Sequence, residues 1–225
     1  MNMELLNYQF SLIGKFDTIY NDINGFSNIF PDYSKKEIQR DIMPNGNVIN
    51  CYILSNDTKS IVVHLNRIDF SFRNNPINQE VDIQEFNNFF TKICSHIDNI
   101  DRIAINYNCF INDSNSTYSN KLSHCFSIFG NSNNSFEFSV RENNVFEANN
   151  LKFNNILTIQ KGILQKNDSF ESLNALIFLF DINSAEINQN SSDFIKQTSL
   201  FNNFSKMYEK LLERLNDVEK FLEGI

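Results

Sequence analysis

The sequence predicts an α+β fold in which antiparallel strands are packed by amphipathic helices. Several segments alternate apolar and polar residues, which is typical of strands with one buried face. Loops of hairpin length separate some of these segments, so the strands cluster and do not alternate with helices. Residues 200–222 instead place apolar side chains three and four positions apart, which predicts a long C-terminal amphipathic helix.

The first expected element is a strand at residues 6–12, where Leu6 and every second residue after it are apolar. Because alternate residues of a strand point to opposite sides, we expect this strand to have one buried face that includes Leu6. A short helix follows it, which Asp17 or Thr18 is expected to cap and Pro31 to end.

Three extended segments are expected next, at residues 37–43, 48–54 and 61–72. A loop at residues 56–59 is expected to join the last two as a hairpin. In the third segment the apolar parity changes between Leu65 and Ile68. This change predicts either a bulge near Asn66 and Arg67 or burial on both faces of the strand.

The following helix is expected to begin at Asp82 and Glu85, which form a D-x-x-E capping signature. The second half of the chain then repeats the kinds of element found in the first. We expect, in order, a strand at residues 102–111, a short helix at 122–129, strands at 136–141, within 145–164 and at 173–187, and the long helix.

Both halves therefore read as a strand, a short helix, about three strands and an amphipathic helix. We divide the chain at residues 1–99 and 100–225, as two α+β halves or as one intimately packed domain. An internal duplication is one interpretation of this similarity. Chance is the other, because Phe and Asn are so abundant that short similar segments recur by accident. A duplication predicts two sheets related by a pseudo-two-fold axis, or one continuous sheet with both large helices on the same face.

The composition argues against several classes of function. The chain of 225 residues has a net charge of −8, whereas binding to nucleic acid or to a membrane surface depends on clustered Lys and Arg. The sequence shows no apolar run long enough to cross a bilayer and no signal peptide, so we expect a cytoplasmic protein. Widely spaced cysteines predict free thiols, and neither a metal site nor a cofactor motif is expected.

Three short motifs give the chain a family resemblance. They are LNRIDF at residues 65–70 before an F-x-x-F-F helix, RIAINYN at 102–108, and FLFDIN at 178–183 before the final helix. This layout resembles a sporadically distributed family of prokaryotic cytosolic proteins that has no established activity. In that family a "drf" strand, an "R-x-x-x-R-Y-x-N" strand and an "L-D-i-D" strand precede a terminal helix. The chain departs from it in having Asn106 at the second Arg and in lacking Trp. The resemblance implies a fold and an origin, and no catalytic residue.

One group of residues is a candidate for catalysis. His64, Arg67 and Asp69 lie on one predicted strand, and a His oriented by a carboxylate is an arrangement that hydrolytic sites use. Because His64 differs in parity from the other two, the three converge only if the strand is bulged. The alternative is a solvated polar set. The single charges of Arg102 and Asp181 are expected either to form a buried ion pair or to end strands.

The expected function is that of a non-catalytic protein-interaction protein of prokaryotic or phage origin, such as an adaptor, a chaperone-like protein or an inhibitor. Its partner would be another protein, bound through a sheet edge or the long helix, and self-association as a homodimer is also expected. The alternative is a small hydrolase or nuclease-like enzyme that uses the three residues named above. The partner-binding residues predicted on the long helix are Phe201, Tyr208, Leu211, Leu215 and Leu222.

Overall fold

The computed structural model describes residues 3–42, 48–72, 79–115, 117–126, 139–165, 172–185 and 197–224. Its strands are β1 (Glu4–Lys15), β2 (Lys35–Ile42), β3 (Val48–Ser55), β4 (Lys59–His64), β5 (Arg67–Phe72), β6 (Asn99–Asn112), β7 (Ser139–Ala148), β8 (Leu151–Gln165) and β9 (Ser172–Ser184). Its helices are α1 (Asp17–Asn21), α2 (Ile23–Asn28), α3 (Gln79–Ile93), α4 (Thr117–Phe126) and α5 (Gln197–Gly224), with a 3-10 turn at Cys94–His96. The predicted α+β class and the long C-terminal helix are confirmed.

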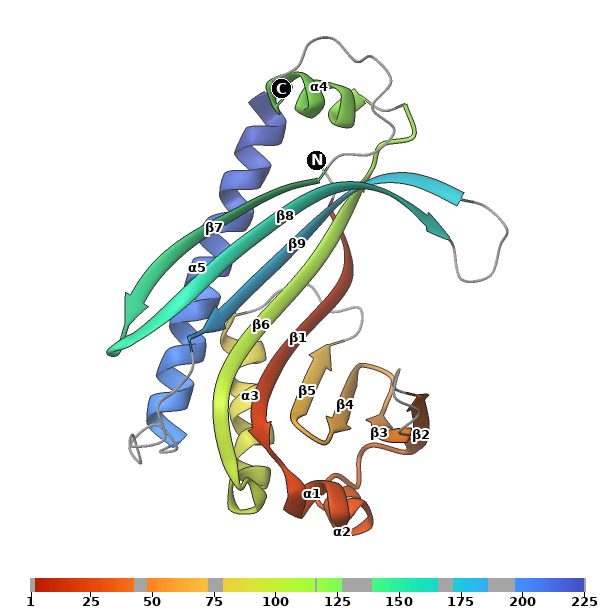
Figure 1. Cartoon of the computed structure of the whole chain (residues 1–225), viewed down its shortest axis with the longest axis vertical. Coiled ribbons are helices and arrows are strands. Elements are labelled where there is room, and N and C mark those ends of the chain that lie inside the picture. The colour runs from red at the N-terminus through yellow and green to blue at the C-terminus, as the bar shows by residue number, and fades with distance from the viewer. Residues whose placement is uncertain are drawn as a thin grey trace.

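The described strands form one nine-stranded sheet in the order β2-β3-β4-β5-β1-β6-β9-β8-β7. All neighbouring strands are antiparallel. β1 and β6 pair in the middle of the sheet and run side by side through the molecule (Figure 1). In each half of the chain the first strand pairs with the last strand of the same half, β5 or β9. Each half therefore builds one side of a continuous sheet.

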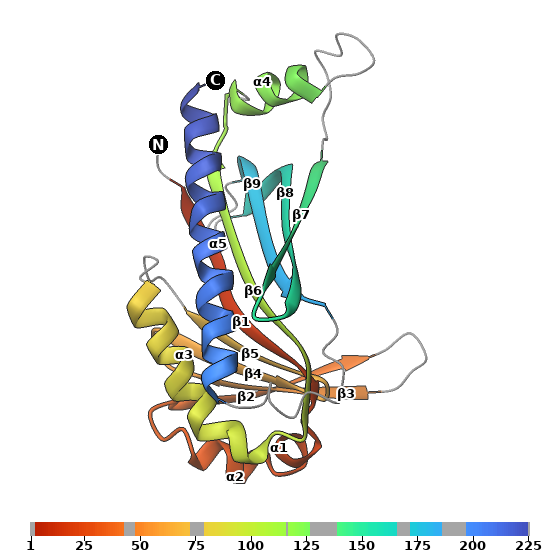
Figure 2. The same cartoon turned by 90° about the vertical axis from the view of Figure 1, so that its left-hand side faces the viewer.

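Both large helices, α3 and α5, lie on the same face of the sheet (Figure 2). The structure thus has the continuous-sheet arrangement that the similarity of the two halves predicts. The duplication itself, and the division into domains at residues 1–99 and 100–225, stay predictions. None of the helices in the described residues has the length and apolar character needed to span a membrane.

The core lies between the sheet and these two helices. At its centre Phe10 of β1, Phe86 of α3 and Phe204 of α5 meet, with ring centroids 4.8 Å apart for Phe10 and Phe86 and 4.3 Å apart for Phe86 and Phe204. All three side chains are buried. Such aromatic pairs contribute about 0.5–1.5 kcal/mol each beyond the area that they bury. The apolar side of the C-terminal helix is therefore docked on the sheet of its own chain.

Two strands, β4 and β5, replace the third extended segment expected from the sequence. A turn at Leu65 and Asn66 joins them, and His64 pairs directly with Arg67 across the hairpin. The predicted bulge near Asn66 and Arg67 is therefore wrong. The apolar parity changes there because the chain reverses direction, not because an extra residue is inserted.

The register irregularities lie instead in the pairing of β1 with β6. One of them falls between Leu5 and Asn7, and the other between Ile13 and Gly14. The first shifts the alternation of side chains, so Leu6 is 44% exposed and does not belong to the core as predicted. A bulge of this kind moves one residue out of the two-residue period without ending the strand.

The sequence also contains a hairpin turn that its pattern did not reveal. Asn149 and Asn150 connect β7 to β8 and have φ values of 51° and 62°. Positive φ at both central residues is what a tight type I′ hairpin turn requires. The Nδ2 of Asn149 donates to Oδ1 of buried Asn203 at 2.9 Å, which fixes the turn to α5. The sequence predicts one strand that ends at residue 141 and another within residues 145–164. In the structure β7 instead runs without a break to Ala148, where this turn begins.

The starts of the helices differ from the predicted capping pattern. The carboxylate of Asp98, and not that of Asp17, caps α1: it accepts bonds from the backbone N–H of Thr18 at 3.1 Å and from its hydroxyl at 2.8 Å. These bonds, the backbone one first, lower the pKa of Asp98. α3 begins three residues before Asp82, which is buried inside the helix and accepts a bond from the hydroxyl of Tyr208 at 3.0 Å.

Candidate functional site

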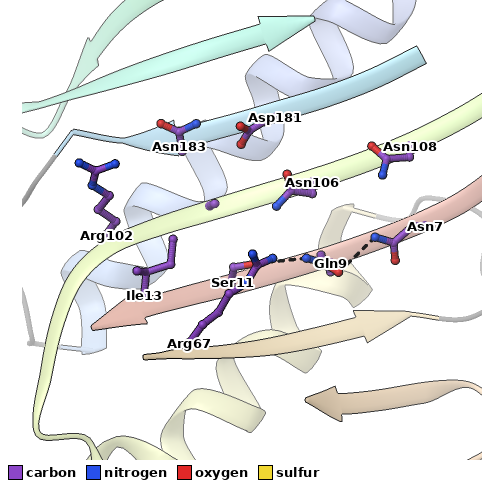
Figure 3. Close-up of a pocket in the computed structure, with 11 residues that line it drawn as sticks. Asn7, Gln9, Ser11, Ile13, Arg67, Arg102, Asn106, Asn108, Asp181 and Asn183 are labelled. Atoms are coloured by element: carbon purple, nitrogen blue, oxygen red, sulfur yellow. Dashed lines mark hydrogen bonds between the residues drawn. The ribbon is translucent and has the colours of Figure 1, made fainter. Parts of the chain in front are cut away.

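A hollow of about 320 Å³ lies on the face of the sheet opposite α3 and α5. We call it the polar groove, because its lining consists mainly of amide, hydroxyl and charged side chains from four adjacent strands. The polar groove comprises Asn7, Gln9 and Ser11 of β1, Arg67 of β5, Arg102, Asn106 and Asn108 of β6, and Asp181 and Asn183 of β9, with Ile13 and Ala104 as its two apolar members (Figure 3).

The register of the sheet sets these side chains in rows across the strands. In one row Gln9, Asn106 and Asp181 are direct neighbours on β1, β6 and β9. The next row contains Asn183 of β9 and the short side chains of Ser11 and Ala104. Because alternate residues of a strand share a face, every second residue of β1 and β6 lines the groove, and most of these residues are polar. The short side chains of the second row leave room above the sheet.

Hydrogen bonds join the groove residues of β1 along the strand. The Nδ2 of Asn7 donates to Oε1 of Gln9 at 3.1 Å, and the Nε2 of Gln9 donates to Oγ of Ser11 at 3.4 Å (Figure 3). On the other side of the groove, the Nδ2 of Asn154 on β8 donates to Oδ1 of Asn183 at 3.0 Å. These bonds orient the amides and leave further donors and acceptors facing outward.

The centre of the groove is different, because three of its polar side chains have no partner within the described residues. In the part of the chain that the structure describes, Asn106, Asn108 and Asp181 make no side-chain hydrogen bond or ion pair. All three are half-buried. Half-buried amides and a carboxylate that lack partners in the chain are groups whose hydrogen-bonding capacity remains for water or for a ligand.

The β4–β5 hairpin brings the predicted residues His64, Arg67 and Asp69 together beside the groove. Oδ1 of Asp69 accepts bonds from Nε of Arg67 and from the hydroxyl of Ser11, each at 2.6 Å. A terminal nitrogen of Arg67 also donates to Oγ of Ser11 at 3.2 Å. Asp69 is 7% exposed, so a buried carboxylate fixes the position of the guanidinium at the edge of the groove.

This network does not have the geometry of a catalytic relay. Nε2 of His64 lies 3.9 Å from Sγ of Cys51 and 4.0 Å from Oδ2 of Asp69, so the same ring nitrogen faces both groups. A relay needs one imidazole nitrogen on the nucleophile and the other on the carboxylate. The Ser11 hydroxyl, moreover, donates to Asp69 and not to an imidazole. The arrangement positions Arg67 and does not activate a nucleophile.

The other predicted pair, Arg102 and Asp181, does not form a buried ion pair. Arg102 is exposed and Asp181 is half-buried. The register pairs Asp181 with Asn106, which lies four residues from Arg102 along β6. The backbone positions of Asp181 and Arg102 are therefore about 13 Å apart along the strand direction. The groove therefore has a negative charge near its middle and positive charges at one end.

The partner-binding residues predicted on the C-terminal helix are not a free surface. Tyr208, Leu211, Leu215 and Leu222 are all buried in the core of their own chain. The side chain of Phe201 lies outside the described residues. The apolar seam of the helix is long because it covers a sheet of long strands, and that contact leaves none of these four side chains for another protein.

The sequence interpretation identified Arg67, Arg102 and Asp181 and missed the amides of the groove. In an Asn-rich chain, single Asn residues did not stand out. The available signal was parity: Asn7, Gln9 and Ser11 alternate with core residues, as do Asn106 and Asn108. The three family-like motifs, at residues 65–70, 102–108 and 178–183, all contribute side chains to this one groove.

Metal ligation and thiol chemistry are two further properties that a binding site could have. Among the described residues, no group of three or more His, Cys, Asp or Glu side chains is placed to hold a metal ion. The described cysteines, Cys51, Cys94 and Cys109, form no disulfide. Burial, followed by the nearby charge of Glu219, raises the pKa of Cys109 to about 12, so this thiol stays protonated and unreactive at neutral pH.

Comparisons with known proteins leave the family open. No protein-family model matches the sequence, and no curated protein sequence matches it. One matching solved structure is that of the di-domain ARO/CYC StfQ from the steffimycin biosynthetic pathway, with 5% identity over 98% of this chain and all of the other chain. Its TM-score of 0.19 is too low to support an argument about fold or function. The resemblance to the prokaryotic family stays a prediction.

Proposed function

We propose that the chain is a non-catalytic protein-binding protein, acting as an adaptor, a chaperone-like protein or an inhibitor, that holds an extended segment of another protein in the polar groove. The observation that carries the proposal is the set of unpaired, half-buried groups at the centre of the groove, Asn106, Asn108 and Asp181. They lie on the open face of the sheet, whereas the predicted helix surface is buried.

Amide side chains suit a peptide backbone, because both carry an N–H donor and a C=O acceptor. The spacing supports the same partner. Side chains at positions i and i+2 of a strand are about 6.8 Å apart, which is also the repeat of an extended peptide over two residues. A segment lying along β6 therefore meets Asn106 and Asn108 in register with its own backbone.

A site-specific cross-link tests the proposal. A photo-reactive benzoylphenylalanine replaces Asn108 in the full chain, and the protein is irradiated in the extract of its native host. We expect cross-links to a defined protein, mapped by mass spectrometry to one of its extended segments. The same probe at Val145 is the control, since Val145 is 63% exposed on the same face of the sheet but lies on β7, outside the groove.

Blocking the groove provides the second arm of the test. Ala104→Phe places a ring on the groove floor, and Val145→Phe adds the same ring outside it. We expect the first variant to lose the cross-link from position 108 and the second to keep it, with both remaining folded by circular dichroism. Equal cross-linking from both variants, or products formed only with a second copy of this chain, would contradict the proposal.

A further inference from the structure

The charges of the polar groove are not evenly spread along the strands. Asp181 lies in the row of Gln9 and Asn106. Arg67 and Arg102 lie at one end, where both pair in the register with Ile13 of β1, one from each side. The groove is thus anionic near its middle and cationic at this end, although the chain as a whole is acidic.

The backbone rows that carry Asp181 and Arg102 are separated by a whole number of two-residue strand repeats. From the row of Asp181 to the row of Arg102 is four residues of β6, or about 13 Å. In an extended peptide, residues i, i+2 and i+4 point to the same side and also span about 13 Å from first to last. The row between the charges contains Ser11, Ala104 and Asn183, and the short side chain of Ala104 leaves space there for the residue at i+2, beside the Arg67 guanidinium that donates to Ser11.

We infer that the segment bound in the polar groove is an extended peptide with a cationic side chain at one position and an anionic side chain four residues away. This inference rests on the proposed function and specifies its partner. The cationic group would bind the carboxylate of Asp181, which has no ion pair within the described residues. The anionic group would lie between the guanidinium groups at the other end.

The two arginines serve this end of the groove in different ways. Arg67 is positioned by the buried carboxylate of Asp69 at 2.6 Å, so its charge is partly compensated. Arg102 is exposed on the other side of Ile13. A bound carboxylate would contact both guanidinium groups, with Arg67 as a donor of fixed position. Arginine suits this role because its guanidinium binds carboxylates through two parallel N–H groups.

Synthetic peptides test the inference by fluorescence anisotropy with the full chain at low salt. The reference probe is a nine-residue peptide of serine and threonine with lysine at its third position and glutamate at its seventh. In the first control both charges are replaced by glutamine. In the second, glutamate moves to the sixth position, which keeps the net charge and turns the carboxylate to the opposite side of the extended peptide.

We expect the reference peptide to bind about tenfold more tightly than either control, because two partly exposed charge pairs are gained together. Asp181→Asn is expected to remove the preference for lysine over glutamine at the third position. Arg102→Gln is expected to remove the preference for glutamate at the seventh. Asp217→Asn and Lys220→Gln make the same changes of charge at exposed sites on α5 and are expected to leave both preferences intact.

The possible failures are distinguishable. If all peptides bind equally, whatever their charge and spacing, the inference is overturned and the proposed function stands. If no peptide binds, including the neutral one, both the proposed function and the inference are overturned. If the reference peptide binds best but Asp181→Asn and Arg102→Gln change nothing, the peptide is recognised elsewhere and the inference is likewise overturned.

Discussion

The two faces of β1 differ sharply, although their residues alternate along one strand. On one face Tyr8, Phe10 and Leu12 are completely buried under α3 and α5. On the other face Asn7 and Gln9 are half-buried and line the polar groove. The two-residue period of a strand thus separates a face that is buried in the core from a face that is open.

The largest expected effect comes from the covered face. Phe10→Ala removes a ring from the centre of the core, where it contacts Phe86 and Phe204, and is expected to lower the free energy of unfolding by about 3–5 kcal/mol. Gln9→Ala is the matched control on the open face, with an expected cost below about 1 kcal/mol. Urea unfolding followed by circular dichroism measures both. Similar costs for the two would remove the distinction between the faces.

The next largest effect concerns the contact between the central strands β1 and β6. A Cβ on Gly14 would lie 2.1 Å from the backbone oxygen of Asn99, so Gly14→Ala forces β1 and β6 apart. We expect a loss of about 1–3 kcal/mol or more, as for other overpacked sites. Gly224→Ala is the control, because nothing lies within 4 Å of its added Cβ. Equal stability of the two variants would show that the contact between β1 and β6 tolerates the extra atom.

A pH titration sharpens the comparison, because Tyr8 of β1, Tyr107 of β6 and Tyr208 of α5 are buried on the covered face. Burial is the first cause that raises the pKa values of Tyr8, Tyr107 and Tyr208 above the ordinary value of about 10. Their neutral forms therefore stabilise the fold fully below pH 10, and this contribution is lost as the pH rises further. We expect the free energy of unfolding to fall above pH 10 by up to about 1.4 kcal/mol per pH unit for each tyrosine.

The variant Tyr208→Phe separates this effect from general alkaline unfolding. It removes the titrating group and the hydrogen bond to Asp82, so at neutral pH it should cost about 1–3 kcal/mol. Above pH 10 its unfolding free energy should fall less steeply than that of the parent chain. A slope unchanged from the parent would mean that the Tyr208 hydroxyl does not titrate differently in the folded and unfolded chains.

The smallest expected effect is on the open face. Asn106→Ala removes an amide that has no hydrogen bond within the described residues, so its effect on the free energy of unfolding should stay within about 0.5 kcal/mol. Binding of the reference peptide should nevertheless weaken. Thermal melting and anisotropy, measured on the same preparation, test this contrast. A marked loss of stability would make Asn106 a structural residue and not a binding one.

Much of the covered face could be predicted from the sequence. The apolar parity of residues 8–12 and 103–111, and the helical spacing of residues 200–222, identify which side chains are buried, because burial needs only local periodicity. Errors occurred where a local signal had two interpretations. The change of parity at Leu65 marked a hairpin and not a bulge, and the turn at Asn149 and Asn150 was hidden among many other Asn residues.

The groove could not be predicted in the same way, because it depends on which strands become neighbours. Gln9, Asn106 and Asp181 are far apart in the sequence and meet only through the pairing of β1 with β6 and of β6 with β9. The helix surface was mistaken for a partner site for the opposite reason. An amphipathic helix shows that a face is buried, but the pattern of Leu211 and Leu215 does not say against which surface.

The pairing of β1 with β6 has a consequence for dividing the chain. A cut between Ile97 and Asp98 falls where the backbone is neither helix nor strand, and it would leave each piece with the inner edge of a long central strand exposed. Asp98 would still be needed to cap α1 of the other piece. Co-expressed, the two fragments should complement one another and rebuild a single sheet, whereas either fragment alone would offer its edge to a second copy of itself.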